Sequence, residues 1–236
     1  MGSPPNNLYA APVASTEPVT PNGMIGTYGP FRNNGGLKNA LVSLLVLDAM
    51  LTIFNTGILN YLDMQQYENE DYLVAEGASQ LDNIIAMGGL IHAGFNIVLI
   101  IIFAIWINRS CKNAWLLDPP RMKTTPGWAV GYYFIPILLL WKPYGAMKEI
   151  RSASYGKDHS LKAVLPLWWT FWLITMFLGN ITFRLYSDAS DVDSYLMASK
   201  LDLIATPLNV ILDYLAIALV TGITLAQQRR LIHWHQ

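Results

Sequence analysis

The chain has 236 residues, of which 53% are hydrophobic and only 13% are charged, and its mean hydropathy is +0.32. Soluble domains carry about 25% charged residues, so this composition excludes an ordinary soluble protein and predicts an integral membrane protein with one domain. The formal net charge of −1 conceals a strong segregation of acidic and basic residues, and no nucleic-acid partner is expected. The single cysteine, Cys111, excludes an internal disulfide and a cysteine-rich zinc site.

The first 36 residues are rich in Pro, Asn, Gly and Ser and have no apolar period. Such a segment cannot bury enough apolar surface to offset the entropy lost on ordering. Residues 1–36 are therefore predicted to be a disordered tail. They lack a basic start followed by a short apolar core, so no cleavable signal peptide is expected.

Four apolar stretches predict transmembrane helices at residues 37–62, 81–107, 164–185 and 201–226. Each is long enough to cross about 30 Å of hydrocarbon, which takes roughly 20 helical residues. The third stretch opens with LPLWWTFW, and we expect its three tryptophans near the membrane interface, which tryptophan favours. Only one histidine, His92, lies in an apolar stretch, so two axial histidines for haem are missing and no cofactor is expected.

Charged residues alternate between the connections. The connections between the first two and the last two stretches are acidic and contain Asp63, Glu68, Glu70, Asp71 and Glu76, and Asp188, Asp191 and Asp193. Basic residues gather in the N-terminal tail, the middle region and the C-terminus, at Arg32, Lys38, Arg109, Lys112, Arg121, Lys123, Lys142, Lys148, Arg151, Lys157, Lys162, Arg229 and Arg230. The positive-inside rule assigns these basic regions, and with them both termini, to the cytoplasm.

Residues 125–151, TPGWAVGYYFIPILLLWKPYGAMKEIR, are apolar but interrupted by Pro136 and Pro143. A fifth crossing here would reverse the charge assignments of every region that follows. Pro136 ends a helix whose preceding nine residues span about 13 Å, enough for half a bilayer. The sequence therefore predicts a re-entrant or interfacial helical hairpin that enters from and returns to the cytoplasm, with the four spans packed around it. The expected fold is an all-α membrane domain at residues 37–230.

Five polar residues lie near mid-depth in the predicted spans: Asp48, His92, Asn96, Asn209 and Asp213. A charge at this depth costs about 2.5–3.5 kcal/mol on insertion scales, so these groups are expected to face the bundle interior. One interpretation is a proton or ion relay, in which the carboxylates titrate and His92 passes protons. The other is interhelical hydrogen bonding, with one or both carboxylates protonated.

The hairpin supplies further candidates for a binding site, namely Trp128, Pro136, Trp141, Lys142 and Pro143. Three roles are open for Lys142: binding lipid phosphate with Trp141 and Tyr144 at headgroup level, reaching Asp48 or Asp213, or extending to the interface. A basic face suited to anionic lipid is predicted at Lys148, Arg151, Lys157 and Lys162.

No enzyme signature is present: the chain has no HExxH, phosphate loop or GxSxG pattern. The first hypothesis is a non-enzymatic accessory, scaffold or regulatory subunit that contacts lipid, a membrane-protein partner or a second copy of the chain. The alternative is a small proton- or ion-coupled transporter or channel that uses Asp48, His92 and Asp213. A membrane-embedded lipid-modifying enzyme ranks third, with Glu149 and His159 as acid/base candidates.

Three runs, WINRSCKNAWLL, TPGWAVGYYFIPILLLWKPYGAMKEI and LPLWWTFWLITMFLGNI, resemble a bacterial membrane-protein family known as domain of unknown function 4328. The resemblance rests on Trp106, Arg109, Asn113, Pro126, Gly127, Trp128, Gly131, Pro136, Trp141, Lys142, Pro143, Met147, Glu149, Trp168, Trp169 and Asn180. It implies a multi-pass protein of the bacterial inner membrane and carries no established activity.

Overall fold

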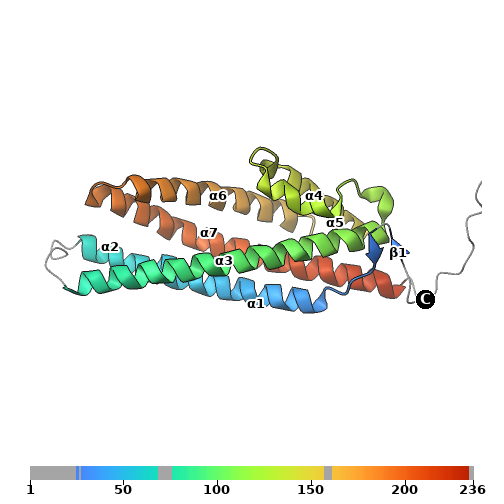
Figure 1. Cartoon of the computed structure of the whole chain (residues 1–236), viewed down its shortest axis with the longest axis horizontal. Helices are drawn as coiled ribbons and strands as arrows, with labels where there is room; N and C mark the ends of the chain where they lie inside the picture. Colours follow the sequence, from blue (N-terminus) through green and yellow to red (C-terminus); the bar gives the residue numbers. More distant parts are fainter. Residues whose placement is uncertain (1–24, 27, 69–75, 157–160, 234–236) are drawn as a thin grey trace, which may run out of the picture.

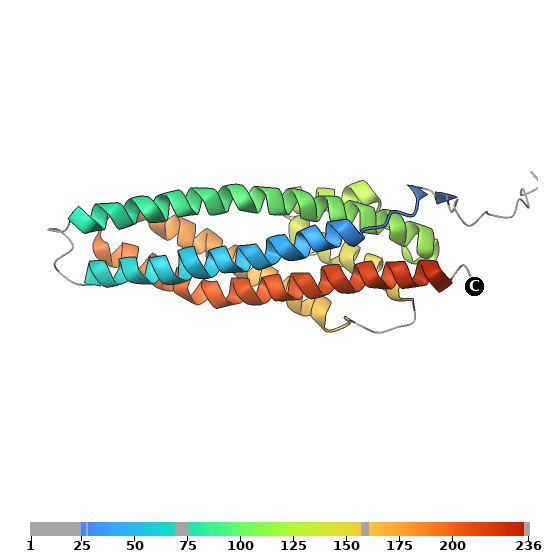
Figure 2. The same cartoon turned by 90° about the horizontal axis from the view of Figure 1, so that it is seen from below.

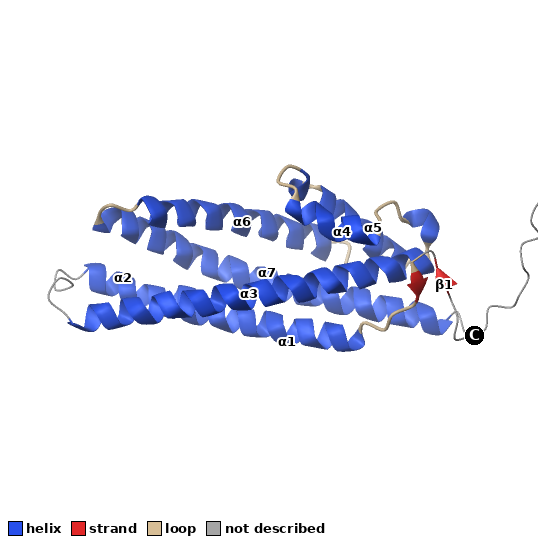
Figure 3. Ribbon diagram, viewed as in Figure 1, coloured by secondary structure: helices blue, strands red, loops and turns tan. Residues whose placement is uncertain are grey.

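The computed structural model describes residues 25–26, 28–68, 76–156 and 161–233. This part of the chain is almost entirely helical (Figures 1 and 3). Four helices are long and apolar enough to cross a membrane, namely Gly35–Tyr67, Gln80–Leu117, Val164–Asp188 and Val192–Ile232. They coincide with the four predicted stretches, so the prediction of an all-α membrane protein with four transmembrane helices is confirmed.

The first membrane helix has three consecutive parts, α1 (Gly35–Thr52), the π-helical η1 (Ile53–Leu59) and α2 (Asn60–Glu68). The second is α3 (Glu76–Leu117), and the last two are α6 (Val164–Asp188) and α7 (Val192–His233). Between α3 and α6 lie the short helices η3 (Pro119–Arg121), α4 (Pro126–Gly131), η4 (Tyr132–Phe134) and η5 (Leu138–Leu140), followed by α5 (Lys142–Tyr155). Two short strands, β1 (Ile25–Gly26) and β2 (Gly29–Pro30), pair antiparallel before α1.

The longest helices exceed the thickness of a bilayer, and at one end of the bundle they extend past the exposed apolar surface. α3 and α7 have 42 residues each, which corresponds to about 63 Å, twice the thickness of the hydrocarbon. The exposed large apolar side chains of α3 run from Ile84 to Ile105, and residues 106–117 contribute none. The end of α3 therefore lies outside the lipid-facing band, and α5 packs beside it (Figure 1).

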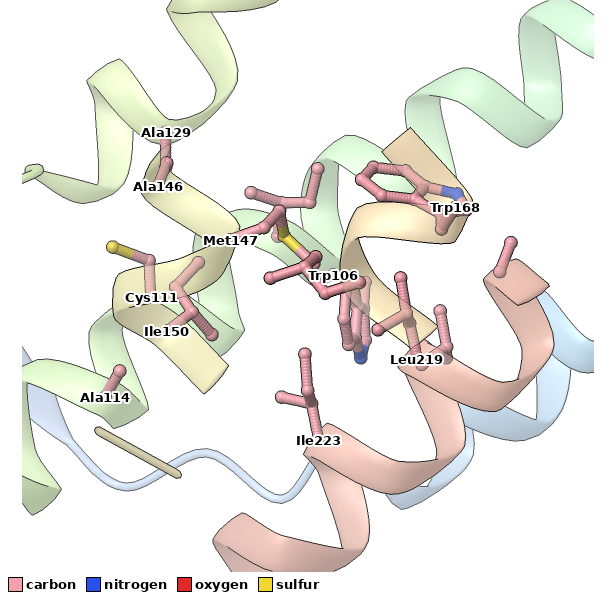
Figure 4. Close-up of a cluster of buried hydrophobic side chains, with 14 of the residues drawn as sticks. Trp106, Cys111, Ala114, Ala129, Ala146, Met147, Ile150, Trp168, Leu219 and Ile223 are labelled. Atoms are coloured by element: carbon pink, nitrogen blue, oxygen red, sulfur yellow. The ribbon is translucent and has the colours of Figure 1, made fainter. Parts of the chain in front are cut away.

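A buried core joins α3, α5, α6 and α7 at this end of the bundle (Figure 4). Its large members include Trp106, Met147 and Ile150, which are essentially inaccessible to solvent. Trp168 and Trp169 of α6 belong to the same core, with exposures of 3% and 7%. The hairpin covers this side of α6; the ring of Tyr144, for example, lies 6.2 Å from that of Trp169. The position of the tryptophans near the membrane interface stays a prediction.

Residues 125–151 form the predicted helical hairpin. α4 and η4 make one arm and α5 makes the other, and the chain reverses at residues 135–137, where Pro136 is exposed in the turn. The hairpin packs against α3, α6 and α7 and lies on one side of the bundle, with α1 on the opposite side (Figure 1). The sequence predicted that all four spans would pack around the hairpin. Only three of them pack against it, because α3 and α7 lie between the hairpin and α1.

The segment before α1 packs along the end of α3. The amide of Arg32 donates to Oδ1 of Asn113, and Nδ2 of Asn113 donates to the carbonyl of Arg32, each at 2.9 Å. Asn34 is 1% exposed, and the ring of Tyr28 lies 5.5 Å from that of Trp115. These residues were placed in the tail predicted at residues 1–36, of which residues 1–24 and 27 lie outside the described part. Their contacts with α3 could not be predicted from composition.

The two ends of the described chain lie at the same end of the bundle (Figures 1 and 2). The side chain of Gln228, near the end of α7, donates to Oδ1 of Asn33, just before α1, at 2.8 Å. An even number of crossings requires this arrangement.

Candidate functional site

The five polar residues predicted at mid-depth all line one cavity of about 560 Å³. Asp48 comes from α1, His92 and Asn96 from α3, and Asn209 and Asp213 from α7. Three helices thus direct their intramembrane polar groups toward a common space. This arrangement agrees with the energetic argument that such groups avoid lipid.

The Asp48 carboxylate contacts the His92 imidazole between α1 and α3. Nε2 of His92 lies 3.0 Å from Oδ1 of Asp48, and the two side chains are only 17% and 12% exposed. At this distance the contact is an ion pair if the ring is protonated, and a hydrogen bond from Nε2–H to the carboxylate if the ring is neutral in that tautomer.

Asp213 has no such partner. It is 7% exposed, and its Oδ2 atom is buried without a hydrogen-bond donor from the described residues. The hydroxyl of Tyr133 on the hairpin is also buried without a hydrogen-bond partner among the described residues. Asp213 and Tyr133 both line the cavity. An unsatisfied buried polar group costs about 1–3 kcal/mol. Both groups line a cavity large enough to hold water or a ligand that would satisfy them.

The two asparagines bond to their own helices. Nδ2 of Asn96 donates to the carbonyl of His92, and Nδ2 of Asn209 donates to the carbonyl of Ala205, each at 3.1 Å. Within the described part of the chain, neither side chain bridges to a second helix. Interhelical hydrogen bonding therefore accounts for the Asp48 and His92 pair but not for the asparagines.

Aromatic side chains form the wall of the cavity nearest the hairpin. They are Phe103 of α3, Tyr133 and Phe134 of η4, and Trp168 and Trp172 of α6. The Tyr133 and Trp172 rings meet edge to face, with centroids 6.1 Å apart and an interplanar angle of 88°. None of these five was predicted as a site residue. The four-residue spacing of Trp168 and Trp172 places both on one helix face. Only the contact with the hairpin shows that this face lines a cavity.

The predicted hairpin residues do not line the cavity. Trp128 and Trp141 are about half exposed, at 52% and 49%, and Pro136 is exposed at the turn. Pro143 is buried in the first turn of α5, where a proline is tolerated because its missing N–H has no helical acceptor.

Lys142 contacts an aromatic ring on the outside of the hairpin. Its Nζ atom lies 5.7 Å from the centroid of the Tyr132 ring, and Trp128 stacks with that ring at 5.4 Å. Lys142 is exposed and does not line the cavity. Of its three predicted roles, an interaction with the cavity carboxylates is therefore not observed.

The described residues of the predicted basic face, Lys148, Arg151 and Lys162, lie at the end of the bundle that carries the hairpin. Lys148 and Lys162 are exposed and Arg151 is partly buried, whereas Lys157 lies outside the described residues. Binding of anionic lipid to this face remains a prediction.

Glu149 has a structural role that the sequence did not reveal. Its Oε2 atom accepts hydrogen bonds from the backbone amides of Lys123 and Thr124, at 2.9 and 2.8 Å. The carboxylate thereby fixes the connection that leads into α4. His159, the other acid/base candidate of the enzyme hypothesis, lies outside the described residues.

A buried hydrogen-bond network between the cavity and the end of α7 was also missed. Gln227 of α7 is 1% exposed, and its Nε2 atom donates to the carbonyl of Ser110 at 2.9 Å and to the hydroxyl of Ser154 at 3.0 Å. Its Oε1 atom accepts from Nδ2 of Asn113 at 3.1 Å. The network joins α3, α5 and α7. The only signal for it in the sequence was a glutamine at the end of an apolar stretch.

A second polar cluster lies at the opposite end of the bundle. The hydroxyl of Tyr195 donates to Oδ2 of Asp63 at 2.5 Å, and Nδ2 of Asn60 donates to the carbonyl of Ser199 at 3.0 Å. These contacts join α2 to α7. Asp63, which the sequence placed in the acidic connection, is fully buried, because the first membrane helix continues past it and packs against α7.

The chain matches the model of one protein family, described as Domain of unknown function (DUF4328), over residues 68–225. The chain belongs to this family. The match confirms the resemblance noted in the sequence, and no curated protein and no solved structure matches the chain. The DUF4328 match includes His92, Asp213 and the whole hairpin, whereas Asp48 lies before it. The cavity is therefore built mainly, though not wholly, from the DUF4328 region.

Proposed function

We propose that this protein is a small proton-coupled transporter that binds its cargo in the cavity between α1, α3, α6, α7 and the hairpin. The observation that carries the proposal is the convergence of Asp48, His92 and Asp213 on one cavity of about 560 Å³. This volume is within the range of about 300–1,000 Å³ that suits a small-molecule ligand. A scaffold or accessory subunit has no need of such a cavity, so the geometry favours the alternative over the first hypothesis.

Charge balance supports coupling to protons. With an imidazolium at His92 and a carboxylate at Asp48, the pair is neutral, and Asp213 then decides the net charge of the cavity. An uncompensated charge near the membrane centre costs at least about 2.5–3.5 kcal/mol. In the empty cavity a proton on Asp213 removes this cost. A bound cargo that satisfies Asp213 takes the place of the proton.

The hairpin is proposed to enter the membrane from the cytoplasm and to close the cavity on that side. Phe134 and Leu139, on either side of the turn, line the cavity together with Asp48 and Asp213. Phe134 and Ile137 are also 74% and 70% exposed, as suits side chains that contact hydrocarbon. A hairpin that moves relative to α6 would open the aromatic wall.

Replacing Asp48 and Asp213 together by Asn is expected to abolish proton movement. The full chain is reconstituted into vesicles that contain a trapped pH-sensitive dye, a pH gradient is imposed, and proton flux is recorded with and without candidate cargo. The double variant should fall to the rate of protein-free vesicles, because no carboxylate in the cavity can then carry a proton.

Asp188→Asn is the matched control, since Asp188 is an exposed carboxylate at the end of α6. It should retain the wild-type flux. Equal flux in the wild type and the double variant would rule out the transporter, provided that both proteins elute as folded, monodisperse species from size-exclusion chromatography.

A further inference from the structure

We propose that the cargo is a monovalent organic cation with an apolar or aromatic body, such as a lipophilic amine or quaternary ammonium compound, and that Asp213 is its counter-charge. This inference rests on the proposed function for its transport step but concerns a different property, namely which ligand the cavity binds.

The charge of the cavity wall selects for a cation. Among the lining residues, the ionisable groups are Asp48, His92, Asp213 and the phenol of Tyr133. Asp48 already has His92 as a partner at 3.0 Å, whereas Oδ2 of Asp213 is buried and has none among the described residues. A ligand with one positive charge would therefore compensate the carboxylate of Asp213. An anion would face two carboxylates and, at most, one imidazolium.

The walls select for an organic cation over a metal ion. No group of three or more His, Cys, Asp or Glu side chains suited to a metal is found in the described part of the chain. Most of the lining is apolar, and its aromatic members Phe103, Tyr133, Phe134, Trp168 and Trp172 come from three different elements. A positive charge is attracted to the faces of such rings, and an apolar body replaces water along them.

Cation and proton compete for the same carboxylate. The groups that share the cavity with Asp213 are Asp48 of α1, His92 of α3 and Tyr133 of η4, while α6 contributes only uncharged rings. When the cation arrives at a protonated Asp213, the proton leaves to water and one positive charge replaces another. Binding should therefore weaken on acidification, by about tenfold per pH unit once Asp213 is protonated in the empty protein.

The test is equilibrium binding to the full chain in lipid nanodiscs, with no gradient present. The probes are tetraphenylphosphonium and tetraphenylborate, which share size and shape but have opposite charges, and benzyltrimethylammonium as a smaller cation. Empty nanodiscs give the partition background. We expect saturable binding of at least one cation, no saturable binding of the borate, and proton release on cation binding in weakly buffered solution.

Two series of variants link binding to the cavity. Asp213→Asn should lower cation affinity at least thirtyfold, as expected when a buried charge loses its partner, whereas Asp213→Glu and the control Asp188→Asn should retain it. Trp172→Ala should weaken binding severalfold and Trp172→Phe should largely preserve it.

The outcomes separate this inference from the proposed function. Saturable binding of the borate, no saturable binding of either cation, or unchanged cation affinity in Asp213→Asn would overturn the inference. Proton flux in vesicles that depends on Asp213 but not on a bound cation would overturn the inference and leave proton transport in place. Cation binding without flux would support the inference and contradict transport.

Discussion

At the scale of single residues, the side chains that the sequence made conspicuous and those that hold the structure together are largely different. Asp48, His92 and Asp213 stand out because charge is expensive in a membrane, and they indeed meet at one cavity. Gln227 and Glu149 belong to no recognisable sequence pattern, yet each forms at least two hydrogen bonds to other parts of the fold. Gln227 joins α7 to α3 and α5, and Glu149 joins α5 to the segment before α4. Their importance depends on long-range contacts, which a single sequence does not display.

Gln227→Ala tests the buried network. It removes three buried hydrogen bonds, to the carbonyl of Ser110, the hydroxyl of Ser154 and the side-chain amide of Asn113, while that amide keeps its bond to the carbonyl of Arg32. At about 1 kcal/mol for each lost hydrogen bond, we expect a loss of about 2–4 kcal/mol in the free energy of unfolding, seen as a lower melting temperature in detergent. The control is Gln228→Ala, whose partly buried side chain makes one exposed bond to Asn33. An equal melting temperature for the two variants would contradict the role of the network.

At the scale of elements, the connection from α3 to the hairpin is fixed from both sides. Nδ2 of Asn108 donates to the carbonyl of Pro126 at 2.9 Å, and Nε1 of Trp115 donates to the carbonyl of Thr124 at 2.9 Å. From the other side, Glu149 of α5 accepts the amides of Lys123 and Thr124. The first arm of the hairpin therefore begins from a fixed point, and any movement must arise nearer the turn.

Glu149→Ala should release this fixed point. The amides of Lys123 and Thr124 then lose their acceptor, so their hydrogen exchange should accelerate by at least about tenfold, as expected for the loss of roughly 1.4 kcal/mol or more of local stability. Exchange in the core of α7 should not change. Lys148→Ala, at an exposed neighbouring position, should leave both amides protected. Unchanged protection in Glu149→Ala would show that α3 alone holds the connection.

The path of the hairpin could be predicted from the sequence, but its packing against α6 could not. Pro136 and the charge count correctly predicted a reversal of the chain between two short helical arms, because both depend on local composition. The aromatic wall was missed, since Tyr133 and Trp172 become neighbours only when the hairpin packs on α6. For the same reason the burial of Trp168 in the core was not predicted. Periodicity identifies a face of a helix but not what covers it.

At the scale of the whole molecule, the arrangement is asymmetric along the bundle. One end has the buried core, the hairpin and most of the exposed basic residues, and the other end has the acidic turn between α6 and α7. In this turn Asp191 accepts the amide of Ser194 at 2.8 Å, and this bond lowers the pKa of the Asp191 carboxyl. That carboxylate therefore stays ionised at neutral pH beside the start of α7, where the helix dipole favours negative charge.

The positive-inside rule then predicts the orientation, with the hairpin end in the cytoplasm. Single cysteines are introduced into a Cys111→Ser background, and intact cells are treated with a membrane-impermeant maleimide. Asp193→Cys, in the acidic turn, should be labelled in intact cells. Lys148→Cys, on the basic face, should be labelled only after the membrane is permeabilised. Ile137→Cys, in the hairpin turn and outside the cavity lining, should resist the aqueous reagent in both cases, because a re-entrant turn contacts hydrocarbon. Labelling of Ile137→Cys as fast as Lys148→Cys after permeabilisation would instead place the hairpin at the interface, and labelling of Lys148→Cys in intact cells would reverse the orientation.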